Sequence, residues 1–347
     1  MIGTILDVSV VICSYTSERW HELVAAVESL RQQVALPREV IVVIDHNPSL
    51  LELARARLPG VIVTENREPA GLSGARNSGI ALAQGTFVAF LDDDAVAEPD
   101  WLLELYRLCA NPKILGAGGA VVPNWIGKRP AWFPEEFYWV LGCSYRGLPR
   151  SLSPVRNPYG GCNCMRRDIF AVVGGFRNGL GRIGTLPMGG EETELAIRAK
   201  RHWPQHIFLY EPRAKIHHRV EASRTTWRYF LARCYAEGLS KAAIAQFAGA
   251  DLGLASERSH VLRTLPLGVL RGLGDALLYS DPNGFLRAIA IVVGLIWTIA
   301  GYVRGTLPLR KTINAPAETD SVRKIELAPP VLSQEQVVDA VPSAGRK

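Results

Sequence analysis

The stretch that decides the fold is Phe87–Asp94, FVAFLDDD, in which an apolar run leads directly into three carboxylates. A short apolar run of this kind is typical of a strand buried in a parallel sheet. In open α/β sheets, ligands bind at the carboxyl ends of the strands, which is where the three aspartates fall. Adjacent carboxylates repel one another unless a cation neutralises them. The triplet therefore favours a divalent-metal site over the alternative, a solvated turn that caps the next helix.

The residues before this stretch alternate between short apolar runs and the spacing of amphipathic helices. Val8–Cys13 is a β-branched run, and Leu23, Val27 and Leu30 follow it at helical spacing. Strict alternation of strand and helix predicts a parallel α/β sheet with helices on both faces. The expected strands are 8–13, 39–45, 61–65 and 87–92, and the expected helices are 21–33, 50–58, 72–84 and 101–109.

The pattern changes after the last of these helices. Residues 116–161 show no period and are predicted to form an irregular, tryptophan-containing excursion. A helix is expected over 225–248, two apolar stretches over 261–310, and a disordered tail after Arg310. We therefore expect an α/β domain over 1–222, a helical region over 223–310 and a tail over 311–347.

The composition limits the class of protein. The chain has 347 residues, of which 48% are hydrophobic and 21% charged, so it can bury a core of its own. Its net charge of +6 fits an anionic substrate or membrane surface. No basic stripe interleaved with aromatic residues occurs, so nucleic acid is not an expected partner. Six cysteines without a C-x-x-C pair, and no basic residue before Arg19, predict chemistry that faces the cytoplasm.

Two side chains are candidates for work beside the aspartates. Asp45 ends the expected strand 39–45 in the way Asp92 ends its own, so both fall at one edge of the sheet. Asp45 could equally be a turn residue before Asn47. Arg76, near the start of an expected helix, could reach a phosphate or form a structural ion pair with Asp92.

Two later motifs add a possible base and a possible metal ligand. Glu191 and Glu192 follow two glycines, so one of them is a candidate general base, although acidic first turns also stabilise helices. His217 and His218 are expected to end a strand. A lone histidine is usually structural, but one beside a metal–diphosphate site is a plausible ligand.

Six motifs extend from about residue 7 to residue 220: VSVVICSYTSER, VIDHN, GLSGARNSG, FLDDDAVAEPDW, GGCNCMRRDIFAVVGGF and GGEETELAIRAKR. In these motifs and their order, the chain resembles the inverting family 2 glycosyltransferases of the GT-A fold. This resemblance implies a mixed, mostly parallel sheet. It also implies a nucleotide-sugar donor, with UDP the commonest nucleotide in the family, and Mn²⁺ or Mg²⁺. The apolar stretches over 261–310 add the expectation of a C-terminal helical region that associates with membranes.

The resemblance also implies a role for each candidate. Glu192 matches the base that removes the proton of the acceptor hydroxyl, and Glu191 competes with it because this position carries Glu where the family has Asp. The metal would be held by Asp94, with His217 as a further ligand. The other positions would bind the nucleotide sugar: Tyr15 and Asp45 at the nucleobase, Arg76 at the diphosphate, Asp92 at the ribose, and Asp93 with them.

The acceptor is indicated by a narrower resemblance. FLDDDAVAEPDW together with residues 129–147 is similar to a subgroup that includes archaeal glucosyl-dolichyl-phosphate glucuronosyltransferases. It implies a glycolipid or polyprenyl-phosphate-linked saccharide as acceptor, in the synthesis of envelope or surface glycans. Arg177 and Asn178 replace the acidic residues that usually follow GGF, which leaves acceptor contacts open. The Gln-x-x-Arg-Trp pattern of processive synthases is missing, so single transfer is expected.

The apolar stretch 288–303 bears on localisation. Its 16 uncharged residues between Arg287 and Arg304 fall short of the roughly 20 that span a bilayer. It could be a marginal span, an interfacial helix or a buried helix paired with 261–278. We favour attachment to the cytoplasmic face of the membrane, peripherally or by a single C-terminal span. The functional alternative, a catalytically inactive nucleotide-sugar-binding protein of the same fold, is disfavoured by the complete aspartate triplet.

Overall fold

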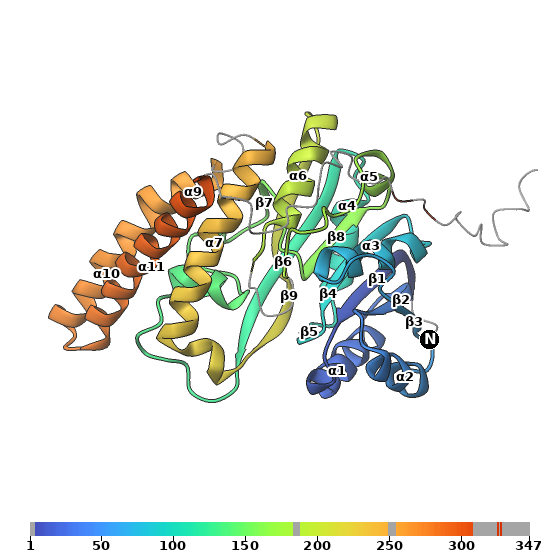
Figure 1. Ribbon diagram of the computed structural model, residues 1–347, viewed down its shortest axis with the longest axis horizontal. Coiled ribbons are helices and arrows are strands. Elements are labelled where there is room, and N and C mark those ends of the chain that lie inside the picture. The colour runs from blue at the N-terminus through green and yellow to red at the C-terminus, as the bar shows by residue number, and fades with distance from the viewer. Residues whose placement is uncertain (1–3, 183–187, 249–254, 308–324, 326, 328–347) are drawn as a thin grey trace, which may run out of the picture.

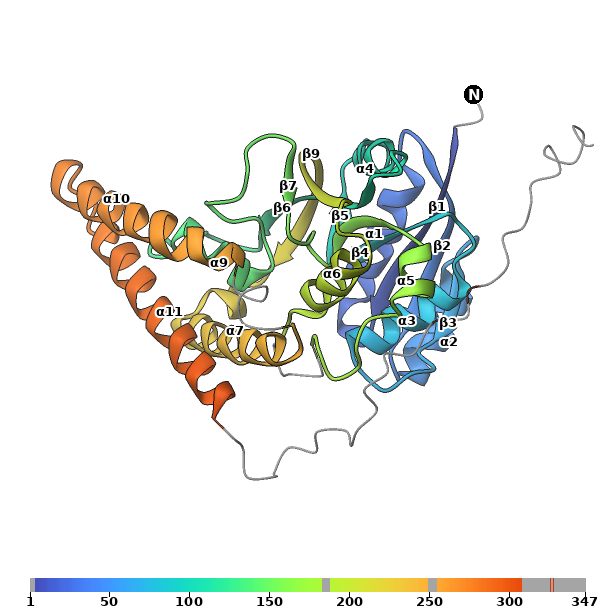
Figure 2. The ribbon, with the colours of Figure 1, turned by 90° about the horizontal axis from the view of Figure 1, so that it is seen from above.

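The computed structural model describes residues 4–182, 188–248, 255–307, 325 and 327. A twisted sheet runs through the body of the protein, and a hairpin of two long helices stands off to one side (Figures 1 and 2). The strands are β1 (Ile5–Ser14), β2 (Leu36–Ile44), β3 (Ile62–Glu65), β4 (Phe87–Asp92), β5 (Ala95–Ala97), β6 (Ile114–Trp125), β7 (Ser153–Val155), β8 (Cys162–Arg166) and β9 (Ile207–Val220).

Helices connect the strands and continue beyond them. Short 3₁₀ turns occur at Ser17–Arg19, Glu135–Leu141 and Ala222–Thr225, and a π turn at His260–Thr264 joins two helices. The α-helices are α1 (Trp20–Arg31), α2 (Pro48–Arg57), α3 (Leu72–Leu82), α4 (Trp101–Cys109), α5 (Asp168–Val172), α6 (Glu191–His202), α7 (Trp227–Ala248), α9 (Ala255–Ser259), α10 (Leu265–Leu278) and α11 (Asn283–Thr306).

The sheet confirms the mixed α/β fold. Its order is β3-β2-β1-β4-β8-β6-β9-β5, with β7 added to β9. The first four strands in this order are all parallel, as the sequence predicts. The other strands form a mixed half, in which β8 is antiparallel to β4 and β6, whereas β6 and β9 are parallel. Because β1, β2 and β4 are parallel and adjacent, their carboxyl ends meet at one edge.

Each face of the sheet carries its own apolar core. Successive residues of a strand point to opposite faces, so Val10 and Ile12 of β1 pack into one core while Val11 packs into the other. The first core includes residues of α1, α2 and α4, and the second includes residues of α3, α5 and α6. The prediction of helices on both faces is confirmed.

The structure corrects the prediction for residues 116–161, because β6 is a twelve-residue strand that starts at Ile114. Its glycines let neighbouring backbones come close. A Cβ at Gly116 would lie 2.8 Å from the carbonyl oxygen of Cys164, and one at Gly119 would overlap the carbonyl oxygen of Ala214. This strand was missed because glycines replace the β-branched residues that usually mark strands.

The C-terminal helices pack on the α/β body and on one another. Helix α11 lies along α7 and pairs with α10 (Figure 2). The approach is close, since a Cβ at Gly301 would overlap the carbonyl oxygen of Tyr235 in α7. Of the expected tail over 311–347, the structure describes only Ile325 and Leu327, which pack against the second core. The rest of that expected tail lies outside the described residues, and the domain boundaries stay a prediction.

Candidate active site

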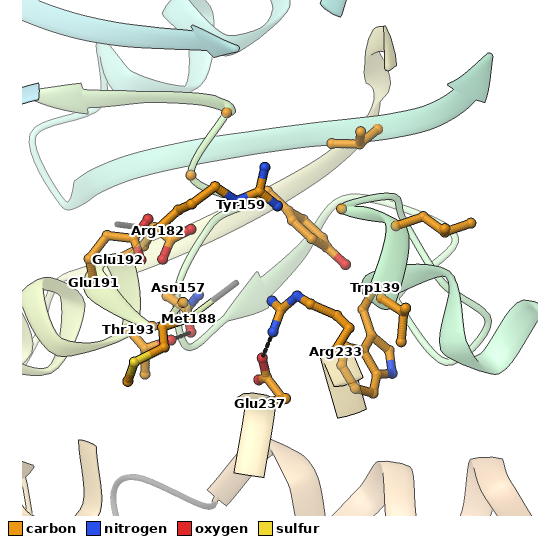
Figure 3. A pocket seen from close by; sticks show the side chains of 18 of the residues that line it. Trp139, Asn157, Tyr159, Arg182, Met188, Glu191, Glu192, Thr193, Arg233 and Glu237 are labelled. Atoms are coloured by element: carbon orange, nitrogen blue, oxygen red, sulfur yellow. Dashed lines mark hydrogen bonds and ion pairs between the residues drawn. The ribbon is translucent and has the colours of Figure 1, made fainter. Parts of the chain in front are cut away.

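A cavity of about 1460 Å³ lies at the carboxyl ends of β1, β2 and β4 and extends to α7 and the C-terminal helices. Part of its wall is shown in Figure 3, where Glu191, Glu192 and Thr193 at the start of α6 lie across from Arg233 and Glu237 of α7. The structure thus brings together side chains that lie far apart in the sequence. Predicted site residues in the cavity wall are Tyr15, Asp45, Arg76, Asp92, Asp93, Asp94, Glu191 and Glu192.

Asp93 is tied back into the protein. The Ser14 hydroxyl donates a hydrogen bond to it at 2.6 Å, and Arg19 contacts its other oxygen at 3.1 Å. Burial and the charge of Asp94 raise the pKa of Asp93 to about 6, although Arg19 and Ser14 act in the opposite direction. Asp93 therefore anchors the aspartate triplet to β1 and to the turn that follows it.

Asp94 is held ionised by its surroundings. Burial opposes its charge, but His218, Arg224 and Arg19 together keep the pKa of Asp94 well below its usual value. Arg19 approaches one oxygen at 3.2 Å and Arg224 at 3.5 Å. Asp92 is more open, with 40% of its side chain exposed. Asp94 is thus ionised and paired, whereas Asp92 is the more accessible carboxylate of the two.

The histidine beside these carboxylates is His218, and the prediction of His217 is corrected. His217 lies on the opposite face of β9, where Nε2 contacts a Glu98 carboxylate oxygen at 3.0 Å. His218 lies 3.0 Å from Asp94, measured between Nδ1 and Oδ1. Adjacent residues of a strand point to opposite faces, so only one histidine of the pair can reach the aspartates. The sequence alone did not fix which one.

Asp92, Asp94 and His218 could hold a metal ion, since one potential ligand atom of each lies within 4.8 Å of the others. Two carboxylates and an imidazole are donors that suit Mn²⁺. The Nδ1 atom of His218 faces Oδ1 of Asp94 at 3.0 Å, so a cation bound between the two groups would be shared by both. This donor set fits a divalent cation.

Glu191 and Glu192 have different environments at the start of α6. Glu191 is buried and forms an ion pair with Arg76 at 2.9 Å. Burial opposes the charge of Arg76, but Glu191, Glu192 and Asp92 outweigh it and raise the pKa of Arg76. Glu192 is only half-buried, and burial together with repulsion by Glu191 raises its pKa to about 8. Glu191 thus holds an arginine, whereas Glu192 is a carboxyl group that could exchange a proton with a substrate.

Two glycines complete the floor of the site. A Cβ at Gly160 would lie 2.8 Å from Nη2 of Arg76 and 2.9 Å from Cδ of Glu192, and one at Gly161 would overlap the carboxylate of Asp92. The backbone before β8 therefore fits directly beneath the functional groups. The sequence contained these glycines within GGCNC, but glycine offers no chemistry that would mark it as a site residue.

Tyr15 and Asp45 line the cavity just after the ends of β1 and β2. Tyr15 is 42% exposed, with the Arg19 guanidinium 5.7 Å from its ring centre, so one ring face could stack on a base. Asp45 accepts hydrogen bonds from the Asn66 side chain at 2.6 Å and from the Gly71 backbone N–H at 2.8 Å. Asp45 thus fixes the loop that leads into α3 as well as facing the cavity.

Arg19 and Arg224 are site residues that the sequence analysis missed. Arg19 is the last residue of the motif VSVVICSYTSER, but its charge had no assigned partner. Arg224 approaches the site from the turn after β9, 130 residues beyond Asp94 in the chain. No local pattern links such distant residues, so only the fold could reveal this contact.

The structure thus gathers Asp92, Asp94, His218 and Glu192 around one cavity at the edge of the sheet. The model of the family described as "Glycosyl transferase family 2" matches residues 9–174. The glucosyl-dolichyl phosphate glucuronosyltransferase of Haloferax volcanii is 35% identical over 242 residues, which are 68% of this chain and 76% of that protein. This chain therefore belongs to glycosyl transferase family 2.

Two more distant proteins are also similar to this chain. The succinoglycan biosynthesis protein ExoM of Rhizobium meliloti is 25% identical over 240 residues, or 67% of this chain and 73% of that protein. The solved structure of the mannosyltransferase PcManGT from Pyrobaculum calidifontis, in complex with GDP-Man and Mn²⁺, superposes with a TM-score of 0.52 at 16% identity. That match covers 84% of this chain and 87% of the mannosyltransferase, and it supports the fold.

Proposed function

We propose that this protein is an inverting, metal-dependent glycosyltransferase that transfers one sugar from a UDP-sugar to a hydroxyl of a lipid-linked saccharide. The observation that carries the proposal is the placement of Glu192 in the same cavity as Asp92, Asp94 and His218. A base and a metal-competent donor site in one cavity are the two parts that such a transfer needs. The H. volcanii relative, a glucosyl-dolichyl phosphate glucuronosyltransferase by name, supports the class of acceptor.

The proposed reaction is a single displacement at the anomeric carbon. Glu192 takes the proton from the acceptor hydroxyl as its oxygen forms the new glycosidic bond, and the bond to the nucleoside diphosphate breaks on the opposite face. The raised pKa of Glu192 makes its ionised form a stronger base than an ordinary glutamate. Asp92, Asp94 and His218 would hold Mn²⁺ or Mg²⁺, whose positive charge would stabilise the leaving diphosphate. Glu191 acts as a positioning residue because it holds Arg76.

The proposed site of action is the cytoplasmic surface of a membrane. Helix α11 is long and apolar enough to cross a bilayer, and 28% of its most apolar window is buried. Because α11 packs along α7, we propose that the α10–α11 hairpin lies in the interface rather than across it. Large exposed apolar side chains on the hairpin are Leu267, Leu270, Leu277, Leu278, Phe285, Leu286, Ile289, Val292, Ile296, Trp297, Ile299 and Val303.

A thermal-shift screen of the purified protein tests the donor half of the proposal. UDP-, GDP- and dTDP-sugars are each compared with Mn²⁺, Mg²⁺ or EDTA, and a metal-dependent rise in Tm with UDP-sugars is expected. The product formed from the stabilising donor is then examined by NMR, where an inverted anomeric configuration is expected. Stabilisation without transfer to any lipid-linked saccharide would favour the inactive nucleotide-sugar-binding alternative, and retention at the anomeric carbon would refute the single displacement.

A further inference from the structure

The two ends of the cavity carry opposite charge. At the carboxyl ends of the strands, six carboxylates face four arginines, a formal excess of two negative charges: Asp45, Asp92, Asp93, Asp94, Glu191 and Glu192 against Arg19, Arg76, Arg182 and Arg224. At the end formed by α7, α9 and the segment after β7, four cations face two carboxylates, an excess of two positive charges: Arg156, Arg233, Lys241 and Arg258 against Glu237 and Glu257. The first end suits a divalent cation and the second suits an anion.

The basic end is a connected set of ion pairs. Arg156 pairs with both oxygens of Glu257 at 3.0 and 3.1 Å. Lys241 bridges Glu257 at 2.6 Å and Glu237 at 3.1 Å, and Arg233 contacts Glu237 at 3.2 Å. Figure 3 shows this last pair in the cavity wall. The side chains of this set are between 14% and 21% exposed, so an anion that enters would meet fixed, partly dehydrated cations.

The basic end is connected to the candidate base. Nη2 of Arg233 lies 3.5 Å from the position that a Cβ on Gly189 would occupy, at the start of α6. On the other side, Asn157 accepts hydrogen bonds from Nε of Arg156 at 2.9 Å and from the hydroxyl of Thr193 at 3.2 Å. Thr193 follows Glu192 in the chain. Arg156 and Arg233 thus both adjoin the segment that carries Glu192, in the wall of the same cavity.

An apolar wall leads from the basic end to the surface of the hairpin. Leu265, Leu295 and Tyr302 line the cavity beyond the ion pairs. Leu262 and Ile299 also line it, and they are 73% and 52% exposed. The cavity therefore opens on the apolar surface that we propose to meet the membrane. A ligand that fits this end of the cavity has an anionic head for the cations and a long hydrocarbon chain for the apolar wall.

We infer that the basic end of the cavity binds the phosphate or diphosphate of a polyprenyl-linked acceptor, whose chain leaves between α10 and α11 and the body. This inference rests on the proposed function, because it identifies the acceptor part of the same cavity. Arg156 and Arg233 contact the phosphate, and Lys241 holds both carboxylates of the set so that the arginines keep their positions.

Binding of farnesyl diphosphate to the full chain in detergent, with EDTA and without nucleotide, tests the inference by titration calorimetry. The arginine variants are Arg233→Gln and Arg156→Gln, and the matched control is Arg228→Gln, an exposed arginine on the same helix as Arg233. Each arginine variant should weaken binding about tenfold or more, the scale of one lost charge-assisted hydrogen bond. The control should bind as the wild type does. Inorganic diphosphate and farnesol should each bind at least about tenfold more weakly than farnesyl diphosphate, because each lacks one half of the ligand.

Separate arms distinguish failure of this inference from failure of the proposed function. Binding of UDP with Mn²⁺ should be unchanged in the Arg233 and Arg156 variants, which also shows that they are folded, and it should be lost in Asp94→Ala. Asp94→Ala should still bind farnesyl diphosphate. The inference is overturned if farnesol or inorganic diphosphate binds as tightly as farnesyl diphosphate. It is also overturned if both arginine variants bind the probe normally, or if Asp94→Ala abolishes that binding. If the wild type binds farnesyl diphosphate but not UDP–Mn²⁺, the proposed donor site is wrong and the inference about the basic end stands.

Discussion

Replacement of Gly160 by alanine should separate catalysis from donor binding. The added Cβ would lie 2.9 Å from Cδ of Glu192 and closer still to its Oε1, whereas ordinary contact begins at 3.4 Å. The carboxylate must therefore retreat by more than 0.5 Å. Gly160 has no left-handed φ, so the alanine backbone itself is not strained. The perturbation acts mainly on the position of the base, and it also presses on Nη2 of Arg76, 2.8 Å from the added Cβ.

The expected loss follows from the precision that catalytic groups need. A base must be held within about 0.5 Å of its productive position, and a misplacement of about 1 Å can cost about 10²-fold in rate. We therefore expect the kcat of Gly160→Ala to fall between about 10-fold and 10²-fold. The affinity for UDP–Mn²⁺ should fall much less than kcat, because Asp92, Asp94 and His218 are not displaced. Arg76 keeps its ion pair with Glu191 through its other nitrogen, Nη1.

The assay is release of the nucleoside diphosphate at saturating donor and acceptor, with calorimetry of UDP–Mn²⁺ binding beside it. Gly161→Ala is the complementary variant: its Cβ would overlap the Asp92 carboxylate, so it should weaken UDP–Mn²⁺ binding. Gly274→Ala in α10 is the control, since no atom lies within 4 Å of its added Cβ. Wild-type kcat in Gly160→Ala, or a defect confined to UDP–Mn²⁺ binding, would refute the assignment of Glu192 as the base.

Three further predictions concern the base, the metal and the membrane. In the wild type, kcat/KM should rise with pH up to about 8, because Glu192 accepts a proton only when it is ionised. Glu192→Gln should lose this rise and about 10²-fold of the rate. A pH profile that this variant leaves unchanged would exclude Glu192 as the base. Asp94→Ala should abolish the Mn²⁺-dependent part of donor affinity, measured by calorimetry with and without EDTA; equal affinities in wild type and variant would contradict the metal site. Leu277 and Leu278 are 72% and 78% exposed on the hairpin. Replacing both by aspartate should reduce sedimentation with anionic liposomes by at least about tenfold, while Val34→Asp, 62% exposed elsewhere, should not; undiminished sedimentation of the hairpin variant would place the membrane contact elsewhere.

Periodicity predicted the parallel strands of the first half and the helix that became α7, but it missed strand β6 between them. The runs at Val8–Cys13 and Phe87–Asp92 became buried parallel strands with little change of bounds, because β-branched and apolar residues dominate them. Strand β6 was missed because its glycines serve close backbone contacts that periodicity does not register. For the apolar stretch 288–303, pairing with the preceding helix and attachment to a membrane were given as alternatives. In the structure α11 pairs with α10 and also exposes apolar side chains, so the two alternatives are compatible.

The sequence by itself determined the α/β class, the family resemblance and the edge of the sheet where the chemistry lies. It could do so because strand periodicity is local and because carboxylates that directly follow buried strands must gather at one edge. Only the tertiary structure decided between His217 and His218, since the side of the strand that faces Asp94 depends on the register of β9 against its neighbours. It also decided that Glu191 pairs with Arg76 while Glu192 stays half-buried, and it brought Arg233 to the start of α6. These contacts join residues more than 40 positions apart, and packing, not local pattern, sets them.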